Sequence, residues 1–209
     1  MRMFNADGSE GEMCGNAIRC VGKYVYDHGI CPKTELVVET LGGDKYLTLN
    51  VKDGKVFEVT VDMGEPELTS ELPEKIHVNG EDREFVGISV GNPHAVYFTE
   101  EIDGLDLEKI GPAYENHERF PNRVNSEFIE LVSRDHIRMR VWERGSGETW
   151  ACGTGATASA VASILMGYTD LTVKVSLRGG DLTIHWNRDT NHVYMTGPAV
   201  EVFHGEIED

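Results

Sequence analysis

The sequence predicts an α+β fold of two pseudo-symmetric halves, in each of which a mostly antiparallel sheet wraps around one central helix. Many short runs along the chain show the period-two alternation of strands. The two clearest helices each follow a Cys-Gly pair. A single shift along the chain superposes four pairs of residues that mark helix starts and ends: Glu10 on Glu148, Cys14 on Cys152, Gly15 on Gly153 and Gly29 on Gly167. This indicates an internal duplication.

Strands account for most of the predicted structure. Each is a run of alternating apolar and polar residues, and Gly-Gly, Asp-Gly or Asn-rich turns separate many of them. The predicted strands are 35–40, 45–51, 55–63, 85–91, 94–100, 128–133, 136–143, 171–177, 181–186, 192–197 and 199–208.

Helices are few. Apolar residues recur at helical spacing after Cys14 until Gly29, and after Cys152 until Gly167, and glycine suits the left-handed position that ends a helix. A third, amphipathic helix is expected within 104–118. Its acidic residues are expected to form a solvated face: Asp103, Asp106, Glu108, Glu115 and Glu118.

The predicted halves are 1–59 with 197–209, and 60–196. Several strands precede Cys152 in the second half, from about residue 85, but few residues precede Cys14. The first half is therefore expected to lack its first strands. That would uncover part of helix 15–28, so we expect a homodimer formed through this half, or local disorder there.

Composition excludes several classes of partner. A formal charge of -17 repels phosphate backbones and anionic membranes, so neither nucleic acid nor membrane is expected. No apolar run is long enough to span a bilayer and no signal peptide is evident, which favours the cytoplasm. The four cysteines are expected to be free thiols. Their spacing does not match a zinc site, so no metal is expected.

The chemistry of the chain is predicted to depend on Cys14 and Cys152. Unpaired N–H groups at a helix N-terminus lower the pKa of a thiol and can also bind a carboxylate. Inversion at a carbon centre needs two acid/base groups, one on each face, and two such cysteines supply them. Cys20 and Cys31 are expected to be small buried packing residues. No motif for pyridoxal phosphate or a nucleotide is present, so no cofactor is expected.

The segments "FNADGSEGEMCGNAIRC", "GNPHAV", "RFPNRVN" and "WERGSGETWACGTGATA" resemble the motifs of the diaminopimelate epimerase family. The resemblance extends from residue 4 to the C-terminal "YMTGPAVEVFHGEI". It implies a cofactor-independent isomerase that converts LL-diaminopimelate to meso-diaminopimelate in lysine and peptidoglycan precursor biosynthesis. Related proline racemases tend to have Cys-Gly-His where this chain has Cys14-Gly15-Asn16, which favours the diaminopimelate branch.

The resemblance also implies roles for single residues. Cys14 and Cys152 are the two acid/base residues, and His94 and Glu143 are accessory groups that tune the thiols. The implied contacts to the amino-acid substrate are Asn5, Gly15, Asn16, Asn92, Asn125, Glu143, Arg144, Gly153 and Thr154.

Two other functions remain open at this point. The first is a racemase of the same fold that acts on another amino acid. The second is a shortened, non-catalytic chain, because members of the family ordinarily begin with further strands that supply two more substrate contacts.

Overall fold

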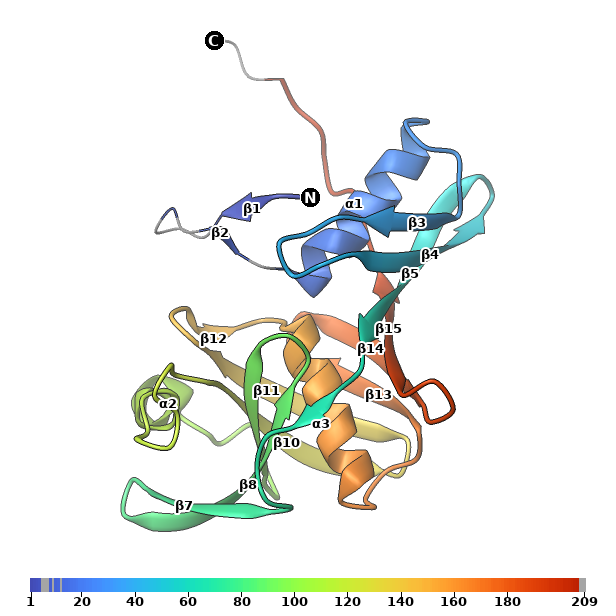
Figure 1. Ribbon diagram of the computed structural model, residues 1–209. Coiled ribbons are helices and arrows are strands. Elements are labelled where there is room, and N and C mark those ends of the chain that lie inside the picture. Colours follow the sequence, from blue (N-terminus) through green and yellow to red (C-terminus); the bar gives the residue numbers. More distant parts are fainter. Residues whose placement is uncertain (5–7, 9, 12, 207–209) are drawn as a thin grey trace. The chain divides into compact units, whose positions relative to one another are not determined.

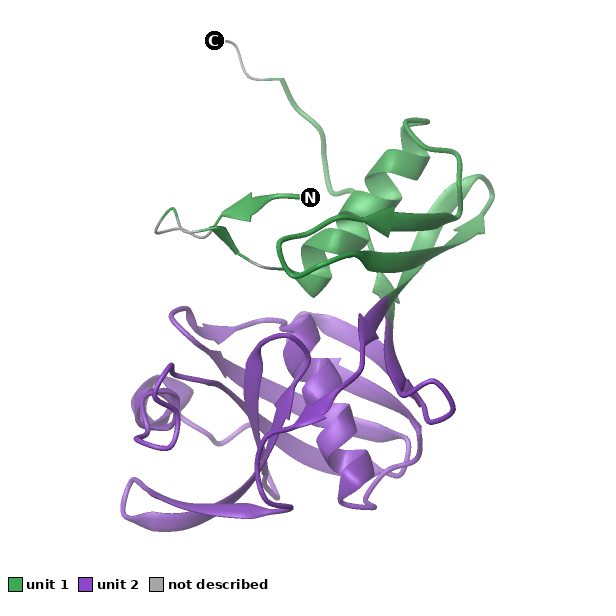
Figure 2. Ribbon diagram, in the orientation of Figure 1, with its two compact units in different colours: residues 1–61, 196–209 green, residues 62–195 purple. Residues whose placement is uncertain are grey.

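The structure is a computed structural model that describes residues 1–4, 8, 10–11 and 13–206. The chain divides into two units, shown in green and purple in Figure 2. Unit 1 comprises Met1–Val61 and Thr196–Asp209, and unit 2 comprises Asp62–Met195. The sequence placed these boundaries between 59 and 60 and between 196 and 197.

In unit 1 a helix packs on a small antiparallel sheet. Gly22 in the middle of this helix allows a close approach, because a Cβ atom there would lie 2.9 Å from the side chain of Leu47 and 3.0 Å from that of Leu49. Ile18 is fully buried on the same helix. The elements are β1 (Met3–Phe4), β2 (Glu10–Gly11), α1 (Gly15–Asp27), β3 (Glu35–Val38), β4 (Lys45–Lys52) and β5 (Lys55–Gly64), whose last residues lie in unit 2 (Figure 1).

Unit 2 is a larger sheet in the order β14-β13-β11-β10-β9-β8-β6, with β12 added to β11 and β7 to β8. Neighbouring strands are antiparallel except for the parallel pairs β9–β10 and β11–β13. The elements are β6 (Glu67–Leu68), β7 (Glu74–Val78), β8 (Glu81–Ser89), β9 (Pro93–Phe98), α2 (Leu107–Glu115), β10 (Asn125–Ser133), β11 (His136–Glu143), β12 (Gly147–Thr149), α3 (Gly153–Leu165), β13 (Thr172–Leu177), β14 (Gly180–Asn187) and β15 (His192–Pro198), whose last residues lie in unit 1.

Strand register assigns the two faces of this sheet. Glu127 lies opposite Val141 and Ile129 opposite Met139, so these four residues share one face. Ser159 of α3 donates a hydrogen bond to Met139, which identifies this face as the one that α3 covers. The opposite face carries an aromatic core that packs with α2 and includes Phe85, Tyr97, Tyr114, Phe128 and Trp142.

Helix α3 is surrounded by the strands of unit 2 (Figure 1). Every residue from Gly153 to Ile164 is buried, and most of them are small. Two of their hydroxyl groups bond back to the helix itself, Thr157 to the carbonyl of Gly153 and Ser163 to that of Ser159. The helix therefore needs no polar face.

The structure confirms the predicted α+β class, its mostly antiparallel strands and its few helices. Gly29 and Gly167 end α1 and α3 with φ of 70° and 74°, as predicted. The predicted third helix is confirmed but shorter, as α2. The strands β2, β6, β7 and β12 were not predicted. No described helix is both long and apolar enough to cross a membrane.

The strand predicted over 199–208 is wrong for the described residues 199–206, which form no strand. Alternation alone predicted it. A strand also needs a neighbour for its backbone hydrogen bonds, and within the described chain this segment has none. Its apolar side chains are largely exposed: 73% for Val200, and 84% for both Val202 and Phe203.

Candidate active site

Cys14 and Cys152 occupy the same local position. Each is the N-cap of a helix of 13 residues, with φ and ψ of -128° and 115° at Cys14 and -125° and 110° at Cys152. The carbonyl of Cys14 accepts from the N–H of Ile18 at 3.0 Å, and that of Cys152 from the N–H of Ala156 at 2.9 Å. The prediction that both thiols lie at helix N-termini is confirmed.

The predicted site residues fall into two groups, one in each unit. In unit 1, Cys14 is half-buried and Gly15 is buried. The buried guanidinium of Arg19 donates to the carbonyl of Gly15 at 2.9 Å, to Oδ1 of Asn16 at 3.2 Å and to the carbonyl of Pro198 at 3.3 Å. Arg19 therefore contacts the first turn of α1, directly after Cys14. Asn5, another predicted contact, lies outside the described residues.

Arg19 was not among the predicted site residues. The signal in the sequence is its position four residues after Gly15 and next to Ile18, on the apolar side of the helix. Burial lowers the pKa of the Arg19 guanidinium, and the neighbouring Cys20 and Cys14 act in the opposite direction.

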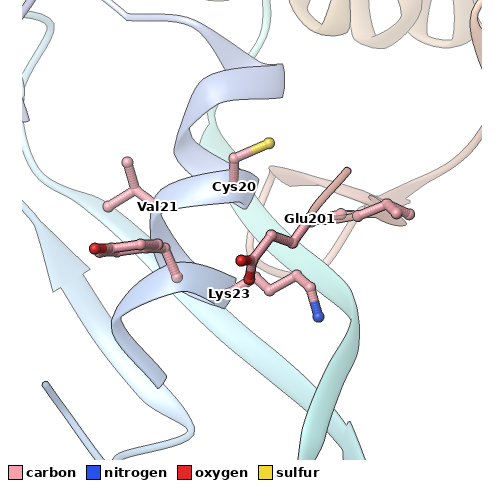
Figure 3. A pocket seen from close by; sticks show the side chains of 7 residues that line it. Cys20, Val21, Lys23 and Glu201 are labelled. Carbon is pink, nitrogen blue, oxygen red and sulfur yellow. The ribbon is translucent and has the colours of Figure 1, made fainter. Parts of the chain in front are cut away.

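A hollow of about 330 Å³ in unit 1 lies apart from the predicted contacts. Cys20, Val21, Lys23 and Glu201 line it, together with Tyr24, Ala199 and Val200 (Figure 3). Neither Cys14 nor Asn16 does. Cys20 is exposed, so the expectation of a buried packing residue is wrong for it, because no strand among the described residues covers this face of α1.

In unit 2, Cys152 is buried, with 7% of its surface exposed. Its Sγ accepts from the N–H of Gly155 at 3.4 Å and lies 3.4 Å from Oγ1 of Thr154. Burial raises the pKa of the Cys152 thiol well above its usual value, and the carboxyl groups of Glu143 and Glu127 raise it further. The two hydrogen bonds lower it less. The expected low pKa is therefore wrong for Cys152 in this structure, because desolvation outweighs the helix N-terminus.

Four polar side chains form a hydrogen-bonded chain that ends at this sulfur. Glu127 Oε1 lies 2.7 Å from Nδ1 of His94, and His94 Nε2 lies 3.0 Å from Oδ1 of Asn92. Asn92 Nδ2 donates to Oγ1 of Thr154 at 3.3 Å, and Thr154 contacts Cys152. Three predicted residues are thus connected to the thiol.

Glu127 was not predicted. Its signal in "NSEFIELVS" is a carboxylate on the same side of the strand as the buried Ile129. It is fully buried, and burial raises its pKa, while the adjacent His94 lowers it less.

The remaining predicted residues of unit 2 lie at the ends of β10 and β11. Asn125 donates to the carbonyl of Pro93 at 3.1 Å and accepts from the N–H of Arg144 at 2.8 Å. Glu143 accepts a hydrogen bond from the hydroxyl of Thr149. The Arg144 side chain is exposed, and within the described chain no side-chain hydrogen bond or ion pair is recorded for it.

The turn that carries Arg144 is fastened by Glu115. This carboxylate accepts from Nε1 of Trp142 at 2.8 Å, from the N–H of Gly145 at 2.9 Å and from Nη1 of Arg123 at 3.0 Å. Glu115 is 6% exposed, so its assignment to a solvated face is wrong. It lies at the end of α2 that faces the aromatic core, where three donors compensate its burial.

All four cysteines are free, as predicted. Within the described part of the chain, no group of three or more His, Cys, Asp or Glu side chains is arranged to hold a metal ion.

Solved structures of racemases and epimerases share this fold. A hydroxyproline epimerase from Agrobacterium vitis matches with a TM-score of 0.75 at 17% identity, over 94% of this chain and 67% of that one. A probable proline racemase from Agrobacterium radiobacter matches with a TM-score of 0.74 at 17% identity, over 94% of this chain and 68% of that one. The fold is therefore that of a class of racemases and epimerases.

The sequence identifies the family within this class. The model of the family described as diaminopimelate epimerase matches residues 1–69 and 86–202. The diaminopimelate epimerase of Agathobacter rectalis is 54% identical over all of this chain and 79% of its own length. That of Desulfovibrio desulfuricans is 56% identical over 99% of this chain and 78% of its own length. The chain belongs to the diaminopimelate epimerase family.

Proposed function

We propose that the chain epimerises LL-diaminopimelate to meso-diaminopimelate without a cofactor, with Cys14 and Cys152 as the two acid/base groups, in lysine and peptidoglycan precursor biosynthesis. The observation that carries this proposal is the repeated N-cap geometry, which gives each thiol the same helix tip. One cysteine removes the α-proton as a thiolate, and the other returns a proton from the opposite face as a thiol.

The raised pKa of Cys152 supports a division of labour in the resting enzyme. A thiol that is neutral before substrate binds is ready to donate its proton. In the reverse reaction Cys152 must act as the base, and the hydrogen bonds from Gly155 and Thr154 then stabilise its thiolate.

The other proposed contacts bind and orient the substrate. Unpaired N–H groups in the first turn of each helix, from Gly15 and Gly153 onward, suit the α-carboxylate. The exposed guanidinium of Arg144 suits a carboxylate in two-point contact, and amides such as Asn92 and Asn125 can both donate and accept. Together these groups stabilise the charge that develops when the α-proton leaves.

Single substitutions test the two-base mechanism. Cys14→Ser and Cys152→Ser should each abolish conversion between the isomers, because a serine hydroxyl is too weak an acid to supply the base. Each should retain one-base chemistry, such as elimination of a leaving group from a substrate analogue. Cys20→Ser, on the same helix as Cys14, is the control. Near-normal epimerisation by both variants would refute the mechanism.

We also propose that the chain acts in the cytoplasm as a homodimer. Four free thiols suit a reducing compartment. The exposed Val200, Val202 and Phe203 of unit 1 are apolar surface of the kind that a second copy covers. Sedimentation equilibrium should give twice the chain mass, and Val202→Asp should lower it. A monomer at all concentrations would contradict the dimer.

A further inference from the structure

The carboxyl group of Glu127 and the imidazole of His94 form a fully enclosed pair, since neither side chain has any exposed surface. Glu127 Oε1 and His94 Nδ1 are 2.7 Å apart. The second carboxyl oxygen, Oε2, has no hydrogen-bond partner among the described residues. In an ionised carboxylate both oxygens share the negative charge, so Oε2 would carry part of this charge without a hydrogen bond. Burying such a charge is unfavourable in free energy. A protonated carboxyl group leaves only a neutral carbonyl oxygen there.

The contacts of Asn92 imply a hydrogen on Nε2 of His94. In the orientation of the structure, Nδ2 of Asn92 donates to Thr154, so Oδ1 accepts the hydrogen of His94 Nε2. A neutral imidazole with its hydrogen on Nε2 has an acceptor at Nδ1. That acceptor faces Oε1 of Glu127, so a protonated Glu127 completes the pair as a donor, with no net charge.

The opposite arrangement is consistent but carries a buried charge. If Asn92 were flipped, its amide nitrogen would donate to His94 Nε2, Nδ1 would carry the hydrogen, and Glu127 would have to be an ionised acceptor. The enclosure of Glu127 and its unpartnered oxygen favour the neutral arrangement. Burial, which raises the pKa of Glu127, acts in the same direction.

The direction of this chain is transmitted to the sulfur. The Thr154 hydroxyl accepts from Asn92, so its own hydrogen is free to point at Sγ of Cys152, 3.4 Å away. Gly155 supplies a second donor to the same sulfur. A Cβ atom at Gly155 would lie 2.7 Å from Glu127 Oε1 and 3.3 Å from Sγ, so the carboxyl group and the sulfur contact the same helical turn.

We propose that Glu127, in its protonated form, is a positioning residue. It holds His94 with its hydrogen on Nε2 and thereby directs the Thr154 hydroxyl, through Asn92, at the sulfur of Cys152. The flipped chain would require Thr154 to donate to Asn92 and would leave the thiolate one donor short. This proposal rests on the proposed function for the role of Cys152, but its structural part can be measured without turnover.

Two substitutions of similar volume separate the proposal from a packing role. In Glu127→Gln, the amide can donate to Nδ1 as the protonated carboxyl group does, so kcat/KM should stay within about threefold of the wild type. In Glu127→Met, no donor remains, and kcat/KM should fall about ten- to hundredfold, the range expected for a lost hydrogen bond in a buried site. Glu130→Met, in the same strand but outside the chain of contacts, is the control.

Nitrogen NMR of the imidazole gives a readout that is independent of activity. In the wild type and Glu127→Gln, His94 should be neutral with its hydrogen on Nε2, whereas Glu127→Met should also populate the Nδ1–H form. Peptide-resolved alkylation across pH should give Cys152 a higher apparent pKa in Glu127→Met than in Glu127→Gln. If the wild type has an imidazolium or the Nδ1–H form, or if Gln and Met are equally impaired, the proposal is wrong. If these readouts hold but no epimerisation is found, the proposed function alone fails.

Discussion

Replacing Glu115 by glutamine should destabilise the protein far more than the loss of one surface charge. The carboxylate receives three donors on two oxygens, Arg123 and Gly145 on Oε1 and Trp142 on Oε2. An amide has only one acceptor atom. In either orientation its NH2 group therefore faces at least one of these donors.

The magnitude follows from what remains buried. The Arg123 side chain is 52% exposed and can bond to water, whereas Trp142 is 8% exposed. A buried donor without an acceptor costs about 1–3 kcal/mol, and each remaining bond to a neutral acceptor is weaker than one to a carboxylate by roughly 1 kcal/mol. We expect Glu115→Gln to lower the free energy of unfolding by about 2–4 kcal/mol.

Urea unfolding followed by tryptophan fluorescence measures this change, with Glu118→Gln, three residues on and exposed, as the control. The control should change stability by less than about 0.5 kcal/mol. Glu115 also accepts a hydrogen bond from Gly145, in the turn that carries Arg144. Epimerase activity should therefore fall even without denaturant, at temperatures at which the variant is still folded. A loss of stability below about 1 kcal/mol would show that the three bonds are not maintained in solution.

Three further predictions concern unit 2. A Cβ atom at Gly111 would lie 2.3 Å from the indole ring of Trp142. Gly111→Ala should therefore lower the free energy of unfolding, measured in urea, by about 1–3 kcal/mol, although alanine has the better helix propensity. A more stable variant would contradict this packing. The hydrogen bond from Arg140 lowers the pKa of Glu148 in the folded protein. The ionised carboxylate therefore stabilises the fold at pH values above the pKa of the unfolded chain, and this stabilisation is lost as the pH falls through the pKa of the folded protein. Glu148→Gln should therefore cost more stability at about pH 7 than at about pH 3, and an equal cost would exclude the linkage. Iodoacetamide at neutral pH should modify Cys152 more slowly than the exposed Cys20, as read by mass spectrometry, and the reverse order would contradict the burial.

The sequence was informative where structure is determined locally. A Cys-Gly pair followed by helical periodicity and a terminal glycine located α1 and α3 closely, because caps and left-handed glycines act within one turn. Strands with clean alternation of apolar and polar residues were also predicted, because this alternation is a local property of the sequence. The segment 199–206 shows the limit, since its alternation is real but no neighbouring strand pairs with it.

The site was predictable only in part, for a similar reason. His94, Asn92 and Thr154 were predicted from a resemblance in sequence. Their buried partner, the carboxyl group of Glu127, is brought next to His94 by the parallel pairing of β9 with β10. Alternation could place Glu127 on the inner side of its strand, but could not show that it lies next to His94, on the same face of the neighbouring strand. The pKa of Cys152 likewise depends on burial by distant strands, which outweighs the local effect of the helix.

The complete burial of α3 determines how rarely the segment that follows Cys152 opens to solvent. Amide hydrogens exchange with solvent only where the structure opens, and a helix with no wet face opens only when the sheet around it does. α1 has an exposed side and can open in part, at less cost. Cys152 is therefore carried by an element whose amides should be among the last in unit 2 to exchange, and its sulfur is held in place for as long as that unit stays folded.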